Sequence, residues 1–198
     1  MKDVVIVDSG GANLASLRFA LERLGARPQV SAEARTISSA DRVVLPGVGA
    51  AAAAMRRLST LGLIPVLRAL TQPVLGVCLG MQLLFERSEE GATECLGVLG
   101  DTVRSLAPRP GLPVPHMGWN TLMPLRSDPL LEGVRPGDYA YFVHSYGVTA
   151  SGTTLASAQY GTALAAVVRG GNFWGTQFHP ERSAATGARI LLNFLRLR

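Results

Sequence analysis

Short apolar runs alternate with amphipathic stretches in the first half of the chain. Val4–Asp8 is apolar and β-branched, as a buried strand would be, and Asn13–Leu24 repeats leucine at helical spacing before Gly25. Such alternation is typical of a parallel sheet with helices on both faces. The same pattern predicts strands near Gln29–Ser31 and at Arg42–Pro46 and Pro73–Val77, and helices in the Ala-rich segment after Gly49, near Ile64–Leu70 and over Leu79–Glu86.

The second half of the chain has a different pattern, in which short strand-like runs are separated by Gly, Pro and Ser turns. The last element, Ala184–Leu197, has helical spacing again. No repeat or long linker divides the chain, so we expect residues 1–198 to form a single α/β domain with a β-rich second half. The strand-like runs are Tyr139–Val143, Thr153–Ser157 and Ala163–Arg169.

Length and composition limit the possible classes of protein. The chain has 198 residues, of which 47% are hydrophobic and 17% charged, and this fits a globular domain with its own core. Two cysteines are too few for a disulfide scaffold. The sequence has no signal-peptide pattern at its start and no apolar stretch of about 20 residues that could span a membrane. We therefore expect a cytoplasmic protein that does not bind a membrane.

The net charge of +5 does not indicate a nucleic-acid partner. The basic residues are almost all arginines and are scattered, with Arg56-Arg57 as the densest pair, whereas a nucleic-acid site needs a clustered patch. Lys2 is the only lysine, which excludes a P-loop. The glycine segment Ser9–Asn13 does not match the dinucleotide fingerprint, and no group of ligand side chains has metal-site spacing. We expect no cofactor and no metal.

Cys78 is the candidate nucleophile. It lies in Gly76-Val77-Cys78-Leu79-Gly80, where a predicted strand meets a predicted helix, and this is the cysteine form of the Gly-x-Ser-x-Gly nucleophile elbow. Glycines two residues away on either side would let backbone segments pass closely around a strained turn. The alternative is a buried structural cysteine, and this is how we interpret Cys95, which has no such setting.

A cysteine nucleophile needs a histidine and usually a group that orients it. Of the three histidines, only His179 has a carboxylate in register, within Phe178-His179-Pro180-Glu181. Residues i and i+2 of an extended segment point to the same side, so Glu181 can accept a hydrogen bond from the ring. We expect His179 to be the base and Glu181 its orienter, and we expect His116 and His144 at most to line the site.

A second glycine-containing turn, Pro46-Gly47-Val48-Gly49, follows another predicted strand. Two glycines there would free backbone N–H groups to face the turn at Cys78. The candidate oxyanion donors are therefore the N–H of Leu79 and those of Val48 and Gly49. An ordinary strand–helix turn is the alternative.

Together these motifs resemble class I glutamine amidotransferases, which use a Cys-His-Glu triad. Further segments narrow the resemblance to the glutaminase subunit of imidazole glycerol phosphate synthase, and they run from the first strand to the last helix. The resemblance implies a flavodoxin-like, three-layer α/β sandwich with a mostly parallel central sheet. The matching segments are Pro46–Gly49, Gly76–Gln82, Ser88–Gly91, Pro115–Asn120, Tyr141–Tyr146 and Gln177–Ser183.

The resemblance also implies a function and a set of site residues. L-glutamine would be hydrolysed to glutamate and ammonia through a thioester on Cys78. The ammonia would pass to a cyclase subunit with a (β/α)8 barrel, in a heterodimer that forms imidazole glycerol phosphate and AICAR for histidine biosynthesis. The glutamine pocket would be lined by Gln82, Glu90, His144, Ser145 and Tyr146, and the cyclase would dock at or near Asn13, Trp119 and Arg182.

Three alternatives stay open on the sequence alone. The glutaminase of another synthase, such as the anthranilate type, shares the elbow and the His-x-Glu pair but should lack the segments around Trp119 and His144–Tyr146. A peptidase-like cysteine hydrolase tends to have its histidine directly after the nucleophile, where this chain has Leu79. A subunit that only binds a partner would not react with glutamine analogues at Cys78.

Overall fold

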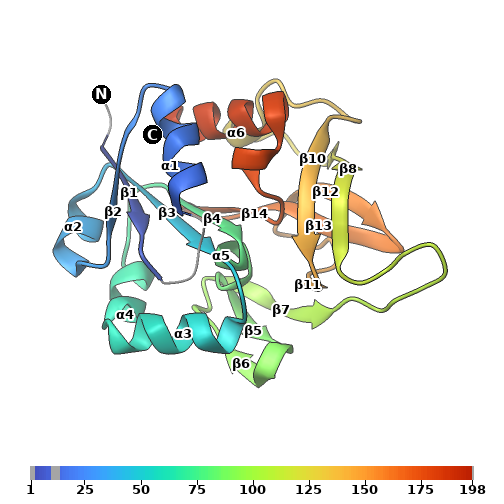
Figure 1. The fold of residues 1–198 in the computed structure, drawn as a ribbon, viewed down its shortest axis with the longest axis horizontal. Helices are drawn as coiled ribbons and strands as arrows, with labels where there is room; N and C mark the ends of the chain where they lie inside the picture. Colours follow the sequence, from blue (N-terminus) through green and yellow to red (C-terminus); the bar gives the residue numbers. More distant parts are fainter. Residues whose placement is uncertain (1–2, 10–13, 198) are drawn as a thin grey trace.

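The computed structural model describes residues 3–9 and 14–197. Its centre is an eight-stranded sheet (Figure 1). The first five strands in the sheet order run parallel, and the last three are antiparallel to their neighbours, so the predicted, mostly parallel sheet is confirmed. In spatial order the strands are β2 (Arg27–Ser31), β1 (Asp3–Val7), β3 (Arg42–Gly47), β4 (Val74–Cys78), β14 (Phe173–Thr176), β13 (Thr162–Gly170), β12 (Thr154–Tyr160) and β9 (Met123–Pro124).

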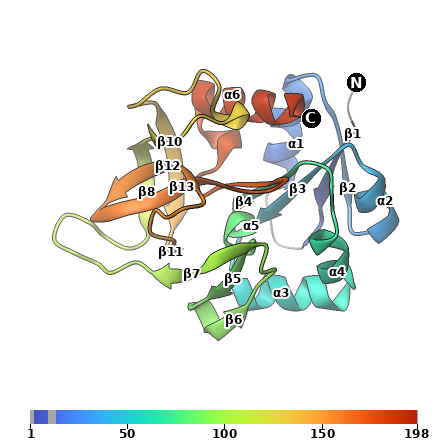
Figure 2. The same ribbon diagram turned by 180° about the vertical axis from the view of Figure 1, so that it is seen from behind.

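Helices cover both faces of this sheet (Figures 1 and 2). On one face lie α1 (Leu14–Arg23) and α6 (Ala184–Arg196), and on the other lie α2 (Ala34–Ser39), α3 (Ala51–Thr60) and α4 (Leu63–Arg68).

The first strand shows why the central strands are apolar throughout. Val4 and Ile6 pack in the core beneath α1 and α6, whereas Val5 and Val7 pack in the core beneath α2, α3 and α4. Successive side chains of a strand point to opposite faces, so a strand buried on both faces has no polar positions. The three-layer arrangement follows from this pattern.

No described helix is long and apolar enough to cross a lipid bilayer.

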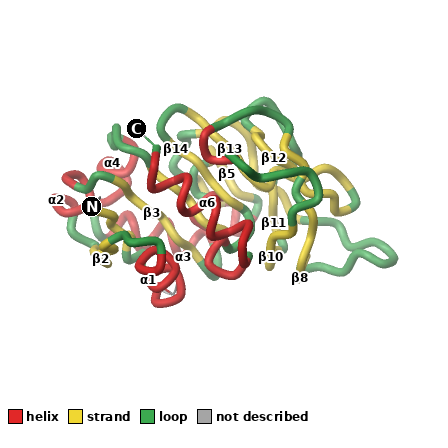
Figure 3. The backbone as a smooth tube through the Cα atoms, turned by 90° about the horizontal axis from the view of Figure 1, so that it is seen from above, coloured by secondary structure: helices red, strands yellow, loops and turns green. Residues whose placement is uncertain are grey.

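The β-rich second half consists of β9, β12, β13 and β14 of the central sheet together with strands of two smaller sheets, and β8, β10 and β11 lie at the end away from α2 (Figure 3). β8 (His116–Thr121) pairs with β10 (Tyr139–His144) antiparallel, with His116 directly opposite His144. The other sheet has the order β11 (Tyr146–Gly147), β7 (Leu99–Ser105), β5 (Phe85–Ser88) and β6 (Thr93–Glu94). Three short 3-10 helices are η1 (Glu90–Ala92), η2 (Pro129–Leu131) and η3 (Pro180–Arg182).

The predicted helix over Leu79–Glu86 is wrong in its length, because α5 spans only Leu79–Gln82. A helix that ended at Glu86 would leave the carbonyl oxygens of residues 83–85 without a partner inside the helix. Those three oxygens instead accept hydrogen bonds from the N–H groups of residues 96–99. The chain therefore leaves the helix and continues as strand β5.

Candidate active site

Cys78 lies at the end of β4, where the chain turns sharply into α5. Its backbone has φ 54° and ψ −112°, a conformation that costs a non-glycine residue about 1–3 kcal/mol. A Cβ atom on Gly80 would lie 1.8 Å from the carbonyl oxygen of Leu45, and one on Gly76 would lie 2.7 Å from that of Gly80. The glycine requirement predicted for this turn is confirmed, because β3, β4 and α5 pass too closely for side chains.

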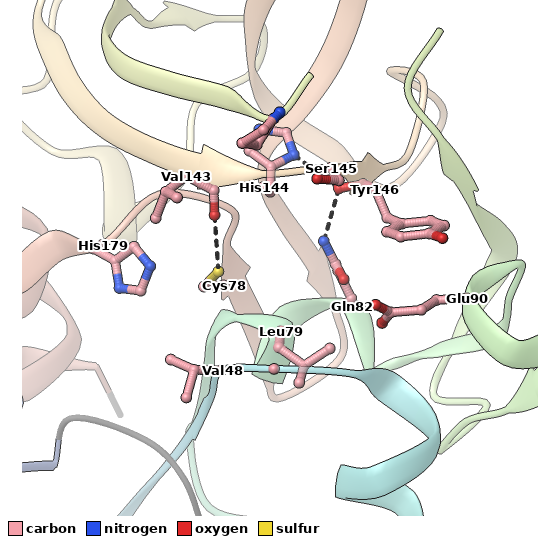
Figure 4. Close-up of a pocket in the computed structure, with 12 residues that line it drawn as sticks. Val48, Cys78, Leu79, Gln82, Glu90, Val143, His144, Ser145, Tyr146 and His179 are labelled. Carbon is pink, nitrogen blue, oxygen red and sulfur yellow. Dashed lines mark hydrogen bonds between the residues drawn. The ribbon is translucent and has the colours of Figure 1, made fainter. Parts of the chain in front are cut away.

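His179 faces Cys78 although the two residues are far apart in the sequence (Figure 4). They meet because β14 lies beside β4 in the central sheet, and the segment after β14 carries His179 to the end of β4. The ring Nδ1 is 2.9 Å from Oε1 of Glu181, and both side chains are largely buried. The other oxygen of Glu181, Oε2, is buried and has no hydrogen-bond partner in the described structure. The fold thus brings the three predicted triad residues together.

The electrostatic environment favours a charged His179 ring. Burial alone would lower the pKa of His179, but its hydrogen bonds to Cys78 and Glu181, together with the charges of these two groups, raise it to about 10. The ring is therefore protonated at neutral pH, and it faces the sulfur of Cys78. A thiolate beside an imidazolium is the reactive form of a cysteine nucleophile.

A pocket of about 340 Å³ opens beside Cys78, which is the size of a small-ligand site. Sequence reasoning missed two residues of its wall, Pro115 and Val143. Neither has a polar side chain, although both lie in segments that carry the resemblance, and the Cys78 sulfur is 3.8 Å from the carbonyl oxygen of Val143. The predicted residues that line the pocket are Val48, Gly49, Cys78, Leu79, Gln82, Glu90, His144, Ser145, Tyr146 and His179.

Two backbone segments border the pocket near the sulfur. Leu79 is the first residue of α5, and the first N–H groups of a helix have no acceptor within the helix. Val48 lies next to Leu79 in the pocket (Figure 4), and Gly49 has φ 84°, a conformation that favours glycine. Oε2 of Glu90 accepts a hydrogen bond of 2.7 Å from the N–H of Ala51, at the start of α3. One oxygen of Glu90 therefore holds the helix that follows the Val48–Gly49 turn.

Comparison with known proteins identifies the family. A family profile described as "Glutamine amidotransferase class-I" matches residues 5–197. Two relatives named "Imidazole glycerol phosphate synthase subunit HisH" match over 197 residues, 100% of this chain and 98% of each relative. The protein from Xylella fastidiosa (strain Temecula1) is 54% identical, and that from Xanthomonas euvesicatoria pv. vesicatoria is 55% identical. The chain belongs to the class I glutamine amidotransferase family, among the HisH subunits.

A solved structure supports the same fold. The crystal structure of a glutamine amidotransferase superposes with a TM-score of 0.76 at 20% sequence identity, and the match covers 98% of this chain and 97% of that chain. At this identity the likeness concerns the fold alone.

Trp119 and Arg182, two further predicted residues of this amidotransferase, do not line the pocket beside Cys78. Trp119 is 53% exposed on β8, and Arg182 is exposed beside a cavity of about 160 Å³ that also borders His179. Asn13 lies outside the described residues.

Cys95 is buried, and burial and the nearby charges of Glu94 and Glu90 raise the pKa of its thiol to about 11, which fits a structural role. In the described ranges no group of three or more ligand side chains could hold a metal ion.

Proposed function

We propose that this chain hydrolyses L-glutamine to glutamate and ammonia through a thioester on Cys78. The ammonia passes to a cyclase subunit, which forms imidazole glycerol phosphate and AICAR in histidine biosynthesis. One observation carries the proposal: Cys78, held on a strained turn, faces the Glu181-bound ring of His179 at the edge of a pocket large enough for an amino acid. Membership of the family and the names of the full-length relatives support it.

The proposed reaction has two steps. The ionised sulfur of Cys78 attacks the side-chain amide carbon of glutamine, and His179 gives its proton to the nitrogen as the C–N bond breaks and ammonia leaves. Water then attacks the thioester while His179 takes a proton from it, and the C–S bond breaks to release glutamate and the thiolate. The N–H groups of Leu79 and of the Val48–Gly49 turn stabilise the negatively charged oxygen that forms in both steps.

The pocket offers groups that suit the polar ends of glutamine. We assign Oε1 of Glu90 to the α-ammonium group, because Oε2 already accepts the N–H of Ala51. The side-chain amide of Gln82 donates to the carbonyl oxygen of Tyr146 at 2.8 Å and to Oε1 of Gln177 at 3.0 Å, so its own oxygen is left to face the substrate. Ser145 and His144 complete this wall.

We propose that the exposed face of the β8–β10 sheet docks the cyclase, a (β/α)8 barrel. Met117, Trp119 and Tyr139 are 62%, 53% and 58% exposed, and their positions in the antiparallel register put them on the same face. An exposed apolar patch of this kind is typical of a protein–protein interface. Val143 lies on the same strand and lines the pocket, so this face adjoins the proposed site of ammonia release. The heterodimer would be cytoplasmic, where both free cysteines stay reduced.

A diazoketone analogue of glutamine tests the proposed activity. In the presence of the cyclase, we expect one equivalent to attach covalently to Cys78 and glutamine to slow the labelling. Cys95 is an internal control, because its buried thiol has a raised pKa and should not react. Mass spectrometry of peptides identifies the labelled residue. If Cys78 is not labelled with or without the cyclase, the chain only binds a partner and the proposal is wrong.

A Glu181→Gln variant should keep a small part of the activity. We expect kcat to fall by about 10²-fold, because the ring of His179 loses a charged partner and is less well oriented. The pKa of His179 should also fall, since the hydrogen bond and the charge of Glu181 both raise it. The basic limb of the pH–rate profile should therefore move to lower pH. Glu86→Gln, the same change at an exposed position, should leave both quantities as they are, and an unchanged profile for Glu181→Gln would contradict the assigned role.

A further inference from the structure

Two buried histidines, His144 in the pocket wall and His116 behind it, form a series of hydrogen bonds that the proposed reaction does not use. The ring of His144 contacts the carbonyl oxygen of Tyr146 through Nδ1 at 2.8 Å and the ring of His116 through Nε2 at 2.9 Å. His116 in turn lies 3.2 Å from the side-chain amide nitrogen of Asn120, which also donates to the carbonyl oxygen of Gln159 at 3.0 Å. The two rings meet because they are direct cross-strand partners in the β8–β10 sheet.

The proton positions on the two rings follow from the groups at the two ends of this hydrogen-bond series, the carbonyl of Tyr146 and the amide of Asn120. A carbonyl oxygen only accepts, so Nδ1 of His144 must carry the proton that it shares with Tyr146, and in a neutral ring Nε2 is then a bare acceptor. Nδ1 of His116 must therefore donate to it, which leaves Nε2 of His116 to accept from Asn120. The amide of Asn120 cannot be reversed, because its oxygen already accepts the N–H of Thr121 at 2.8 Å.

Every donor and acceptor in this hydrogen-bond series is matched only if the rings of His144 and His116 are both neutral and carry their proton on Nδ1. A proton on Nε2 of His144 would point at the N–H of His116, and a charged His116 ring would lose its acceptor for Asn120. Burial lowers the pKa of both rings to about 4, so they are neutral at pH 7.

The inner end of this hydrogen-bond series shapes the wall of the pocket. Strand β10 ends at His144 and β11 begins at Tyr146, so the hydrogen bond from the His144 ring to the Tyr146 carbonyl spans Ser145 and closes the bend between the strands. The same carbonyl oxygen accepts from the side chain of Gln82 (Figure 4). The ring thus fixes a carbonyl that itself fixes a pocket side chain.

We propose that His144 and His116 are positioning residues, a tautomer clamp that holds Ser145, Tyr146 and Gln82 in the arrangement that binds glutamine. This proposal rests on the proposed function only in naming glutamine as the ligand of the pocket. The proton positions of the two rings do not depend on that function. Its loss should weaken glutamine binding and leave the chemistry at Cys78 largely as it is, since neither ring contacts the sulfur or His179 through a hydrogen bond in the described structure.

The tautomers can be measured directly in the full-length protein. The chain has three histidines, so ¹⁵N labelling of histidine gives three rings to assign at pH 7. We expect long-range ¹H–¹⁵N spectra to show the proton on Nδ1 and a bare Nε2 in both His116 and His144. A proton on Nε2 of His144, or a doubly protonated ring at either position, overturns the clamp. This measurement needs neither a variant nor glutamine.

Kinetics in the presence of the cyclase test the consequence. His144→Asn keeps an N–H donor near the position of Nδ1, whereas His144→Gln moves its amide toward the position of Nε2. We expect His144→Gln to raise the KM for glutamine about tenfold with kcat within about threefold, and His144→Asn to recover most of this loss. An equal rise in KM for both variants, or a fall in kcat without a rise in KM, overturns the clamp. Failure of diazoketone labelling at Cys78 in the unsubstituted protein would instead count against the glutaminase activity.

Discussion

Replacing Cys78 with alanine is expected to abolish glutamine-dependent synthesis by the complex and to leave ammonia-dependent synthesis intact. In the proposed reaction the acyl group is bound to this sulfur, and neither His179 nor the backbone donors can replace it. The loss in kcat should be about 10⁴-fold or more, as is usual when a nucleophile is removed. Free ammonia does not need the glutaminase pocket, so the cyclase should still use it. The measurement is product formation by the purified heterodimer with either nitrogen source.

Cys95→Ala is the matched control for this variant. Cys95 is the other cysteine of the chain and is also buried, but it does not line the pocket, so its loss should leave both activities close to those of the unsubstituted protein. If Cys78→Ala retains glutamine-dependent synthesis, the assignment of the nucleophile is wrong. If synthesis is lost with both glutamine and ammonia, the variant no longer binds the cyclase. Co-purification with the cyclase distinguishes this loss of binding from loss of the glutaminase reaction.

A Gly80→Ala substitution should unfold or severely destabilise the protein. In most helices alanine is more stable than glycine by about 0.5–1 kcal/mol, so propensity alone predicts a gain. Here the added Cβ would lie 1.8 Å from the backbone oxygen of Leu45, and β3 cannot move away without disturbing the centre of the sheet. We expect the free energy of unfolding to fall by about 3 kcal/mol or more, which places this among the severe single substitutions. Urea denaturation monitored by circular dichroism measures it.

Gly100→Ala is the control for Gly80→Ala. Gly100 lies exposed on β7, and a Cβ there would have no heavy atom within 4 Å. The free energy of unfolding of the Gly100→Ala variant should therefore differ from that of the unsubstituted protein by no more than about 0.5 kcal/mol. Similar effects of the two substitutions would mean that the tight approach of α5 to β3 is not required for folding.

The turn at Cys78 was accessible from the sequence because its signal is local. Two glycines flank Cys78 at fixed spacing, and the clash distances at Gly76 and Gly80 are the reason for them. The pairing of His179 with Glu181 was accessible for the same reason, since both residues lie in one short extended segment. Both motifs lie within a few consecutive residues and can be recognised in the sequence, although the contact that requires Gly80 is with Leu45 on β3.

Other features depend on tertiary contacts that no local pattern reveals. Helix α2 (Ala34–Ser39) escaped prediction because Ile37 is its only buried side chain, so it has no apolar periodicity. The end of α5 depends on hydrogen bonds to residues 96–99, and the pairing of His116 with His144 depends on the register of two strands far apart in the sequence. Sequence reasoning could give these two histidines no more than a place near the pocket.

The position of β14 in the sheet has a consequence for the order in which the enzyme becomes reactive. β14 lies between β4 and β13 at the centre of the sheet, yet it is the last strand in the chain, and His179 follows it. During synthesis, strands β1 to β4 can pair and form the turn that bears Cys78 long before the ring that activates it exists. On the ribosome, the growing polypeptide therefore carries a Cys78 thiol that is not activated. The thiol becomes a strong nucleophile only when β14 joins the sheet and brings His179 beside it.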